Sequence, residues 1–352
     1  MSMDISQELH QAVVNAYENN QPLRIVGGNS KSFYGRTVDA EMLSIAGHQG
    51  ILNYEPTELT ITARAGTPLA EIEKVLDENG QMLGFEPPAF APGASIGGTI
   101  ACNFSGPRRA TAGAARDFLL GCKLLNGKGE MLSFGGEVMK NVAGYDVSRL
   151  MAGAMGTLGI LLEVSLKVLP KPEVEETLEF HLAATEALRL MNRIAQTPTP
   201  VSASYFYNGV LRLRLSGTET GIKAAMQKLG GEQLSQTQVF WNELKEQQPG
   251  FFQSNKPLWR LSLASDVEAL SLEGEWLYEW GGALRWLASE ADANVIQSTA
   301  AEFDGHATLF RSASGESLFQ SLSPALLRLH KNLKQAFDPK HILNPGKMYA
   351  EI

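Results

Sequence analysis

Cysteine is scarce in this sequence. Only Cys102 and Cys122 occur among 352 residues, and they do not form a CxxC pair. An iron–sulfur cluster takes about four thiolates, and redox dithiols and structural zinc sites use closely spaced cysteines. We therefore expect no metal site in this chain and two small, buried thiols. If the chain carries out redox chemistry, its electrons must leave through a group that it does not carry.

Excess positive charge and long apolar runs are also missing. Lys and Arg total 30 against 38 Asp and Glu, and the net charge is −8. Nucleic-acid binding uses clustered basic residues, so we expect no nucleic-acid partner. No apolar run approaches the roughly 20 residues of a membrane helix, and the acidic N-terminal segment does not read as a signal peptide. We expect a cytoplasmic protein that reaches the inner membrane only through partners.

The chain is long enough for about two domains, with 44% hydrophobic and 19% charged residues. Its first part predicts a helix over 9–17, strands at 23–26, 51–54 and 59–64, and a helix capped by Thr67 that ends at Gly80. A loop is expected over 86–116, then a hairpin at 122–134 and a strand at 161–169. After Pro170-Lys171-Pro172, the order strand, helix, strand, strand, helix, strand predicts a small α+β domain with an antiparallel sheet. A helix is expected at 326–337.

Three glycine-rich segments indicate a ligand site. The first, RIVGGNSKSFYG at 24–35, takes a strand into two glycines, and backbone N–H groups at such a turn bind oxyanions. It is neither a Walker A loop nor a GxGxxG fingerprint. The second, at 93–103, consists mainly of small residues, which suits backbone packed against an extended ligand. An ordinary turn is the alternative for each.

The third segment, 135–159, holds six glycines. Gly153, Gly156 and Gly159 recur at a spacing of three before an apolar strand. Among them are the polar residues Lys140, Asn141, Tyr145, Asp146 and Arg149. A purely structural account of so many glycines beside so many polar groups is strained, so the three segments together predict one elongated ligand.

This arrangement resembles the FAD-binding domain of the family named after vanillyl-alcohol oxidase and p-cresol methylhydroxylase (PCMH). It is similar, more closely, to the FAD-binding E subunits of bacterial glycolate oxidase, through GGNSKSFYGR, TAGAARDFLLG, residues 137–170 and NPGKMYAE. The resemblance implies an α+β fold: a two-lobed PCMH-type FAD-binding domain with a small antiparallel-sheet cap. The expected ranges are 1–172 for the FAD domain, 173–310 for the cap and 311–352 for a C-terminal segment that returns to the FAD domain.

The resemblance also implies FAD and the residues that bind it. The first two segments would enclose the pyrophosphate, a Gly-Thr-Leu-Gly turn would follow the adenosine end, and the C-terminal Asn-Pro-Gly-Lys would close near the flavin. The implied FAD-binding residues are Gly27, Gly28, Asn29, Ser30, Lys31, Ser32, Pro88, Gly93, Ala94, Ser95, Gly97, Gly98, Thr99, Asn103, Gly156, Thr157, Leu158, Gly159, Ile160, Asn344 and Lys347.

Two further points concern how the cofactor is held. Some relatives attach flavin through a histidine in the first loop, whereas this chain has none between His10 and His48, so we expect non-covalent FAD. Lys347 near the flavin would stabilise the anionic reduced ring. An exposed lysine at a chain end is the alternative.

The expected substrate chemistry is less complete. A carboxylate substrate calls for a bidentate Arg, and hydride removal from an alcohol calls for a base near the hydroxyl. The candidates are His306, Arg285 and Arg311. The alternative for His306 is an ordinary strand residue.

In glycolate oxidase, a sister flavin subunit carries the fuller substrate site and a third subunit carries iron–sulfur clusters. We therefore predict an FAD-binding subunit of an oxidoreductase that converts glycolate to glyoxylate. Its partners would be a sister FAD-containing catalytic subunit and an iron–sulfur subunit. The alternatives are a self-sufficient FAD-dependent dehydrogenase of a 2-hydroxy acid such as D-lactate, and a structural subunit that has lost FAD.

Overall fold

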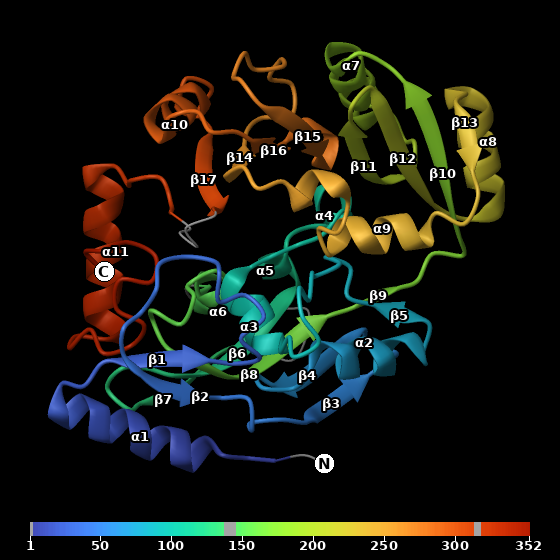
Figure 1. The fold of residues 1–352 in the computed structure, drawn as a ribbon. Helices are drawn as coiled ribbons and strands as arrows, with labels where there is room; N and C mark the ends of the chain where they lie inside the picture. The colour runs from blue at the N-terminus through green and yellow to red at the C-terminus, as the bar shows by residue number, and fades with distance from the viewer. Residues whose placement is uncertain (1–2, 137–145, 313–317) are drawn as a thin grey trace. The chain divides into compact units, whose positions relative to one another are not determined.

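The computed structural model describes residues 3–136, 146–312 and 318–352, so Lys140, Asn141 and Tyr145 lie outside the described residues. The chain divides into two compact units. The first comprises Met1–Ser105, Ala114–Pro170 and Ser321–Ile352, and the second Gly106–Gly113 and Lys171–Gln320 (Figure 1). In the described ranges, no helix is long and apolar enough to cross a membrane.

The first unit is built on an antiparallel sheet with the strand order β3-β4-β8-β6-β7 in its described part. Most residues of β8, the middle strand, are buried, as expected for a strand covered on both faces. The strands of this unit are β1 (Leu23–Val26), β2 (Glu41–Ser44), β3 (Ile51–Glu55), β4 (Thr60–Arg64), β5 (Gln81–Met82), β6 (Leu119–Leu125), β7 (Met131–Gly135), β8 (Ile160–Lys167) and β9 (Leu169–Pro170).

Helices and a short parallel pair of strands complete the first unit. The helices are α1 (Ser6–Asn19), α2 (Leu69–Asp77), α3 (Ile96–Cys102), α5 (Ala115–Phe118), α6 (Val147–Met151) and α11 (Pro324–Phe337). α1 buries Leu9 and Val13, as the 3.6-residue period predicts, together with Ala16. Val14 and Tyr17, expected on the same face, are half-buried. β1 pairs in parallel with β2, and the chain that leaves β1 forms the first glycine-rich loop.

Two local predictions for this unit are wrong. Residues 86–116 are not continuous loop, because they contain α3, α5 and the short helix α4 (Arg109–Ala112), which belongs to the second unit. Ser95 begins α3, and its Oγ accepts a hydrogen bond from Gly98 N–H. Thr67 does not cap α2. Its hydroxyl is instead bonded to the backbone of Gly50, 17 residues away, so a long-range contact replaced the expected local one.

The second unit is an antiparallel sheet whose described strands follow the order β13-β10-β12-β11-β15-β16-β14-β17. Three helices pack on this sheet. α7 packs through Leu188 and Met191, and α8 packs through Ile222. α10 packs through Ile296 and Ala300. Its elements are α4 (Arg109–Ala112), β10 (Val174–His181), α7 (Ala184–Ala195), β11 (Val201–Tyr207), β12 (Val210–Gly217), α8 (Glu219–Leu229), β13 (Glu232–Leu234), α9 (Gln238–Lys245), β14 (Leu258–Ser262), β15 (Glu275–Glu279), β16 (Leu284–Ala288), α10 (Ala293–Ala301) and β17 (His306–Arg311).

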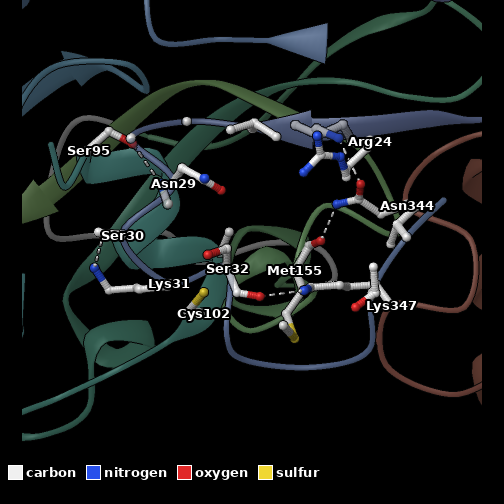
Figure 2. Close-up of a pocket in the computed structure, with 18 residues that line it drawn as sticks. Arg24, Asn29, Ser30, Lys31, Ser32, Ser95, Cys102, Met155, Asn344 and Lys347 are labelled. Carbon is white, nitrogen blue, oxygen red and sulfur yellow. Dashed lines mark hydrogen bonds between the residues drawn. The ribbon is translucent and has the colours of Figure 1, made fainter. Parts of the chain in front are cut away.

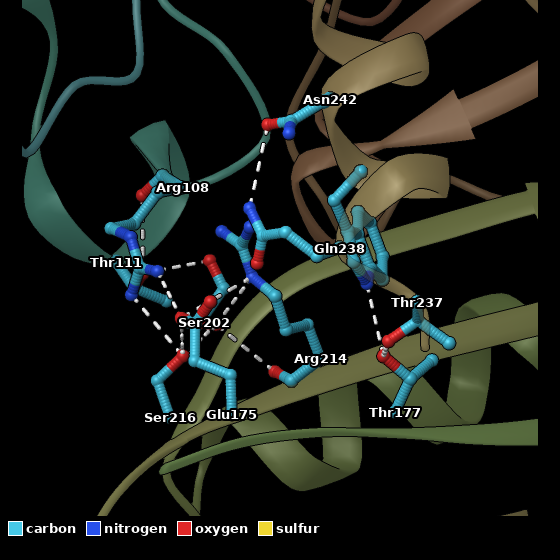
Figure 3. A network of polar contacts seen from close by, with 11 residues as sticks. Arg108, Thr111, Glu175, Thr177, Ser202, Arg214, Ser216, Thr237, Gln238 and Asn242 are labelled. Atoms are coloured by element: carbon cyan, nitrogen blue, oxygen red, sulfur yellow. Dashed lines mark hydrogen bonds and ion pairs between the residues drawn. The ribbon is translucent and has the colours of Figure 1, made fainter. Parts of the chain in front are cut away.

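A short segment, residues 106–113, leaves the first unit and joins the second. Arg108 donates hydrogen bonds to the Glu175 carboxylate and, at 3.3 Å, to Ser216 Oγ (Figure 3). The hydroxyl of Thr111 donates to the backbone carbonyl of Ser202 at 3.2 Å. The expected FAD domain, 1–172, includes this segment, whereas the structure groups it with the second unit. Nothing in the sequence of 106–113 indicates contacts with residues 175–216.

Candidate functional site

The first unit contains a pocket of about 280 Å³ at the end of β1. Residues far apart in the sequence line it, coming from β1, the first glycine-rich loop, α3, the Met155 turn and the C-terminal segment (Figure 2). The predicted residues that line it are Gly27, Gly28, Asn29, Ser30, Lys31, Ser32, Ser95, Gly98, Asn344 and Lys347. The structure therefore brings the first two glycine segments and the chain end to one site.

The pocket is strongly positive. Arg24, Lys31 and Lys347 line it, and no Asp or Glu is among its lining residues. In the described part of the chain, Arg24 has no ion-pair partner. Burial lowers the pKa of Lys347, and the nearby charge of Arg24 lowers it further. The like charges of Arg24 and Lys347 act on each other in this pocket, and an anion bound between them would relieve that repulsion.

The loop after β1 holds its lysine in place. Lys31 is only 7% exposed, and its Nζ donates to Ser30 Oγ at 3.2 Å and to the Ala89 carbonyl at 3.3 Å. Asn29 adopts a left-handed conformation with φ of 55°, which asparagine tolerates better than most residues. This turn places polar side chains and backbone of residues 29–32 along the pocket wall.

Gly28 is required by contact within the protein. A Cβ atom at this position would lie 1.4 Å from the Gly93 carbonyl oxygen, so the first two glycine segments pack backbone against backbone. Gly98 differs, because a Cβ there would meet only Ser95 Oγ, at 3.3 Å, and Gly98 lines the pocket. Packing of the chain on itself therefore explains Gly28, whereas no backbone contact requires a glycine at position 98.

Asn344 ties the C-terminal segment to the pocket wall. Its Oδ1 accepts from Ile25 N–H at 2.8 Å, and its Nδ2 donates to the Met155 carbonyl at 2.7 Å. Gly156, next to Met155, has a φ of 72°, and a Cβ there would lie 2.8 Å from Asn344 Nδ2. Both ends of the Asn344 amide are thus engaged within the protein, which assigns this side chain a positioning role.

A buried ion pair supports the same segment. Lys334 and Asp338 are fully buried, and Lys334 Nζ lies 2.9 Å from Asp338 Oδ2. Lys334 Nζ also donates to the carbonyls of Thr157 and Leu343, while Asp338 accepts from the N–H groups of Ile342 and Leu343. The pair fastens residues 338–344 to the Gly-Thr-Leu-Gly turn.

A second, smaller pocket of about 70 Å³ shares wall residues with the first. Ile25, Gly27, Gly98, Ala101, Met155 and Asn344 line both. The predicted residues Gly97, Gly156, Gly159 and Ile160 line the second pocket only. All three glycine segments therefore contribute to one connected site.

Seven predicted FAD-binding residues line neither pocket: Pro88, Gly93, Ala94, Thr99, Asn103, Thr157 and Leu158. Several have structural partners. Thr157 Oγ1 donates to the Ala154 carbonyl, and Asn103 Oδ1 accepts from Arg116 N–H. Their assignment to FAD stays a prediction that the pocket geometry does not support.

Sequence reasoning missed several residues of this site, among them Arg24, Thr37, Cys102 and Met155. Arg24 could have been found, because it lies in the strand that leads directly into the Gly-Gly turn. Cys102 was expected to be a buried small residue, yet it lines the pocket. Burial raises the pKa of its thiol, although the charges of Lys31 and Lys347 oppose this.

The candidate catalytic residues do not form one group. Arg285 is fully buried, and its guanidinium donates to the backbone carbonyls of Val267, Glu268 and Gly282. This arrangement argues against a role as a substrate clamp. His306 and Arg311 are the first and last residues of β17. At the rise of a strand, their Cα atoms are about 16 Å apart.

Comparison with known proteins identifies the class of protein to which this site belongs. Residues 4–135 match the family described as FAD binding domain, and residues 313–348 match the C-terminal domain of FAD linked oxidases. The chain is thus an FAD-dependent oxidoreductase, and the cofactor expected from its sequence is confirmed. The acid-free group of three cations suits the pyrophosphate of this cofactor.

The chain is 48% identical over 349 residues to the glycolate oxidase subunit GlcE of Escherichia coli (strain K12), which covers 99% of both chains. It belongs to the family of this glycolate oxidase subunit. It is also 33% identical over 189 residues to a D-2-hydroxyglutarate dehydrogenase of Xanthomonas citri, covering 52% of this chain and 39% of that protein.

Solved structures show the same fold. Substrate-bound p-cresol methylhydroxylase superposes with a TM-score of 0.73 at 14% identity, over 99% of this chain and 88% of the other. An alkyldihydroxyacetonephosphate synthase gives 0.67 at 16% identity, over 96% and 74%. The expected PCMH-type α+β fold is confirmed.

Proposed function

We propose that the chain is the FAD-binding subunit of a multi-subunit glycolate oxidase. The complex would oxidise glycolate to glyoxylate and pass two electrons to an iron–sulfur subunit, with a sister FAD-containing subunit carrying the main substrate site. The chain would work in the cytoplasm and reach the inner membrane only through these partners. The relative named as a glycolate oxidase subunit supports this, and the positive, acid-free pocket is the observation that carries it.

The proposed FAD site uses the first unit. Arg24, Lys31 and Lys347 would balance the charge of the pyrophosphate, and the loop at 27–32 would supply N–H and hydroxyl donors. The proposed division keeps the cofactor domain at 1–172 with 311–352 and the cap at 173–310, except that residues 106–113 go with the cap. The smaller pocket would extend this FAD site through Gly97, Gly156, Gly159 and Ile160.

The cofactor would be held without a covalent bond. The loop residues Asn29, Ser30 and Lys31 offer no histidine, and Cys102 is the only thiol among the residues that line the pocket. Burial raises the pKa of Cys102, so its thiol stays protonated and weakly nucleophilic near neutral pH.

Bound FAD supplies the acceptor for the hydride that leaves the hydroxyl-bearing carbon of a 2-hydroxy acid. The residues of this chain hold and orient the cofactor. The engagement of Arg285 with backbone carbonyls and the separation of His306 from Arg311 leave no assembled carboxylate clamp and base among the candidates. This supports a chain that depends on its partners for substrate turnover rather than a self-sufficient dehydrogenase.

Purification of the chain alone and with its partners tests the proposal. The isolated chain should show flavin absorbance, release FAD into solution on denaturation, and give no turnover of glycolate or D-lactate with a dye acceptor. Added partner subunits should restore glycolate oxidation. Turnover by the chain alone would overturn the partner dependence, and a colourless chain that FAD cannot reconstitute would overturn the cofactor site.

A further inference from the structure

The second unit contains a pocket of about 320 Å³. Its walls come from β10, β12, β13, the loop that follows β13 and the first turn of α9. A cavity of this volume lies at the lower end of the range that binds small molecules. None of its lining residues lines either of the pockets proposed to hold FAD, so it is a separate site.

Two buried side chains, Arg214 and Trp241, line this pocket, and each is only 2% exposed. The Arg214 guanidinium lies over the Trp241 ring, 5.2 Å from its centroid. Arg214 Nε donates to Ser202 Oγ at 2.9 Å, and Trp241 Nε1 donates to the Thr177 hydroxyl at 3.0 Å (Figure 3). These contacts within the protein fix both side chains, so this part of the pocket is formed before a ligand arrives.

The charges at the pocket cancel. Glu175 and Glu176 line it with Arg214, and Arg108 forms an ion pair with Glu175. Arg214 Nε lies 3.8 Å from Glu175 Oε1, and Glu176 Oε2 accepts a hydrogen bond from Gln233 at 3.1 Å. A ligand with a net charge would lose its hydration and gain little Coulomb energy from two cations and two carboxylates. This balance favours an uncharged ligand.

The polar groups of the pocket include both donors and acceptors of hydrogen bonds. The exposed side chains of Gln236 and Gln238 line it, and each amide offers two N–H donors and a carbonyl acceptor. No side chain caps α9, so the N–H groups of its first turn add donors beside Gln238. The Glu176 carboxylate adds acceptors. A hydroxyl group both donates and accepts, whereas a carboxylate or phosphate would satisfy the donors alone and lie against Glu176.

We propose that this pocket binds an uncharged sugar ring or a cyclic polyol of similar size. Leu234 and the Trp241 indole would contact the apolar C–H face of the ring. The amides and hydroxyls of residues 235–238 would exchange hydrogen bonds with its hydroxyl groups. A ligand of about a dozen heavy atoms, bound with the efficiency usual for small molecules, has a dissociation constant of roughly 1 mM. The proposal does not depend on FAD or on glycolate oxidation.

Saturation-transfer NMR on the full-length chain tests this directly. The neutral probes are D-glucose, D-xylose and myo-inositol, and the charged probes are D-glucuronate and D-glucosamine. At least one neutral probe should bind saturably below about 20 mM. Both charged probes should bind about tenfold more weakly than the best neutral probe, because the charges of the pocket cancel.

Three variants locate the binding. Gln238→Ala should weaken binding of the best neutral probe about fivefold, because hydrogen bonds to the amide are lost. Gln227→Ala is the matched control, since Gln227 is exposed on α8 of the same unit and lies outside the pocket, and it should bind as wild type does. Glu176→Gln removes one negative charge, so it should raise the affinity for glucuronate relative to the neutral probe. A loss of packing alone would not produce that reversal.

The contrary outcomes are distinct. Absence of saturable binding by all three neutral probes would overturn the proposal. Equal binding by Gln238→Ala and Gln227→Ala would place the contact outside the pocket and overturn it as well. Tighter binding of glucuronate or glucosamine than of every neutral probe would refute the uncharged class of ligand. Each of these results leaves the proposed FAD function intact, because flavin absorbance and glycolate turnover test that function separately.

Discussion

Arg24, Lys31 and Lys347 are more than 300 residues apart at their extremes, yet they line one pocket without a carboxylate among them. Lysine and arginine normally repel one another when they are brought out of bulk water, and the repulsion grows as the local dielectric falls. A dianionic pyrophosphate bound in this pocket, as proposed, would relieve the repulsion between its cations. Arg24 matters most for this interpretation, since nothing in the described protein pairs with it.

Replacing Arg24 with Met should weaken FAD binding about tenfold, equivalent to about 1.4 kcal/mol, because one charge-assisted contact is lost. Titration of the apoprotein with FAD, followed by flavin fluorescence at low and high salt, measures the effect. The variant should also show a smaller salt dependence. Lys74→Met is the matched control, since Lys74 is 77% exposed and outside the pocket. Unchanged affinity in Arg24→Met would exclude Arg24 from the site.

Glu279 is a second unusual residue, in the second unit. Its side chain is buried, Trp286 Nε1 donates to its Oε1 at 2.8 Å, and burial raises its pKa from 4.5 to about 7. At pH values between 4.5 and about 7, the Glu279 carboxyl keeps its proton in the folded chain and loses it in the unfolded chain. The contribution of Glu279 to stability therefore falls as pH rises through this window, and the full cost of the buried charge remains above about pH 7.

The variant Glu279→Gln should be more stable than wild type at pH 8 by roughly 1–3 kcal/mol and close to wild type at pH 5. Glutamine keeps an acceptor for Trp286 and removes the ionisation. Urea unfolding of both proteins at the two pH values measures the difference. The exposed residue Glu232, changed to Gln, should alter neither value. Equal stability of Glu279→Gln and wild type at pH 8 would contradict the raised pKa.

At the scale of elements, the C-terminal segment after α11 lines the pocket at the end of β1, and a fully buried ion pair holds this segment in place. Lys334 donates to the carbonyls of Thr157 and Leu343, and Asp338 accepts two backbone N–H groups. Burial lowers the pKa of Lys334, and the charge of Asp338 opposes that shift. Such a pair costs desolvation, but removal of one member leaves the other uncompensated.

Replacing Lys334 with Met should destabilise the first unit by about 3 kcal/mol and reduce FAD content, because Asn344 follows the segment that the pair holds. Adding Asp338→Asn should recover part of the loss by removing the stranded charge. Chemical unfolding of the apoprotein gives both values. Lys331→Met, on the exposed side of the same helix, should change stability little. A loss below about 0.5 kcal/mol for Lys334→Met would show that the pair is dispensable.

At the scale of the molecule, the chain forms two compact units, and the two pockets proposed to hold FAD lie within the first. The second unit has its own core beneath α7, α8 and α10. A ligand stabilises only the unit whose folded form binds it. The two units should therefore respond differently to FAD.

Calorimetry should resolve two transitions in the apoprotein. FAD at 100 times its dissociation constant should stabilise the first unit by about 2.7 kcal/mol and raise its transition alone. Glu279→Gln at pH 8 should raise the other transition, since Glu279 lies in β15 of the second unit. A single transition that both changes shift equally would show that the units unfold as one.

Much of the local structure follows from the sequence. The strand Leu23–Val26 and the hairpin around Asn126 to Gly129 appear where the sequence predicts them, because apolar alternation and turn residues act between near neighbours. The three glycine segments predicted one elongated ligand, and the family resemblance that they carry predicted FAD, which the family match confirms. The predicted helix cap at Thr67 is wrong, because the Thr67 hydroxyl accepts a hydrogen bond from Gly50 N–H instead of from the first turn of α2.

The sequence by itself therefore determined many of the elements, and through its motifs the fold family and the cofactor. Only the tertiary structure decided that Arg24 joins the pocket, that Asn344 serves as a tie between β1 and the Met155 turn, and that Arg285 is held by backbone carbonyls. It also decided that position 28 must be glycine, because the backbone of Gly93 packs directly against it. These roles depend on contacts between residues tens to hundreds of positions apart, and such contacts leave no periodicity or spacing in a single sequence.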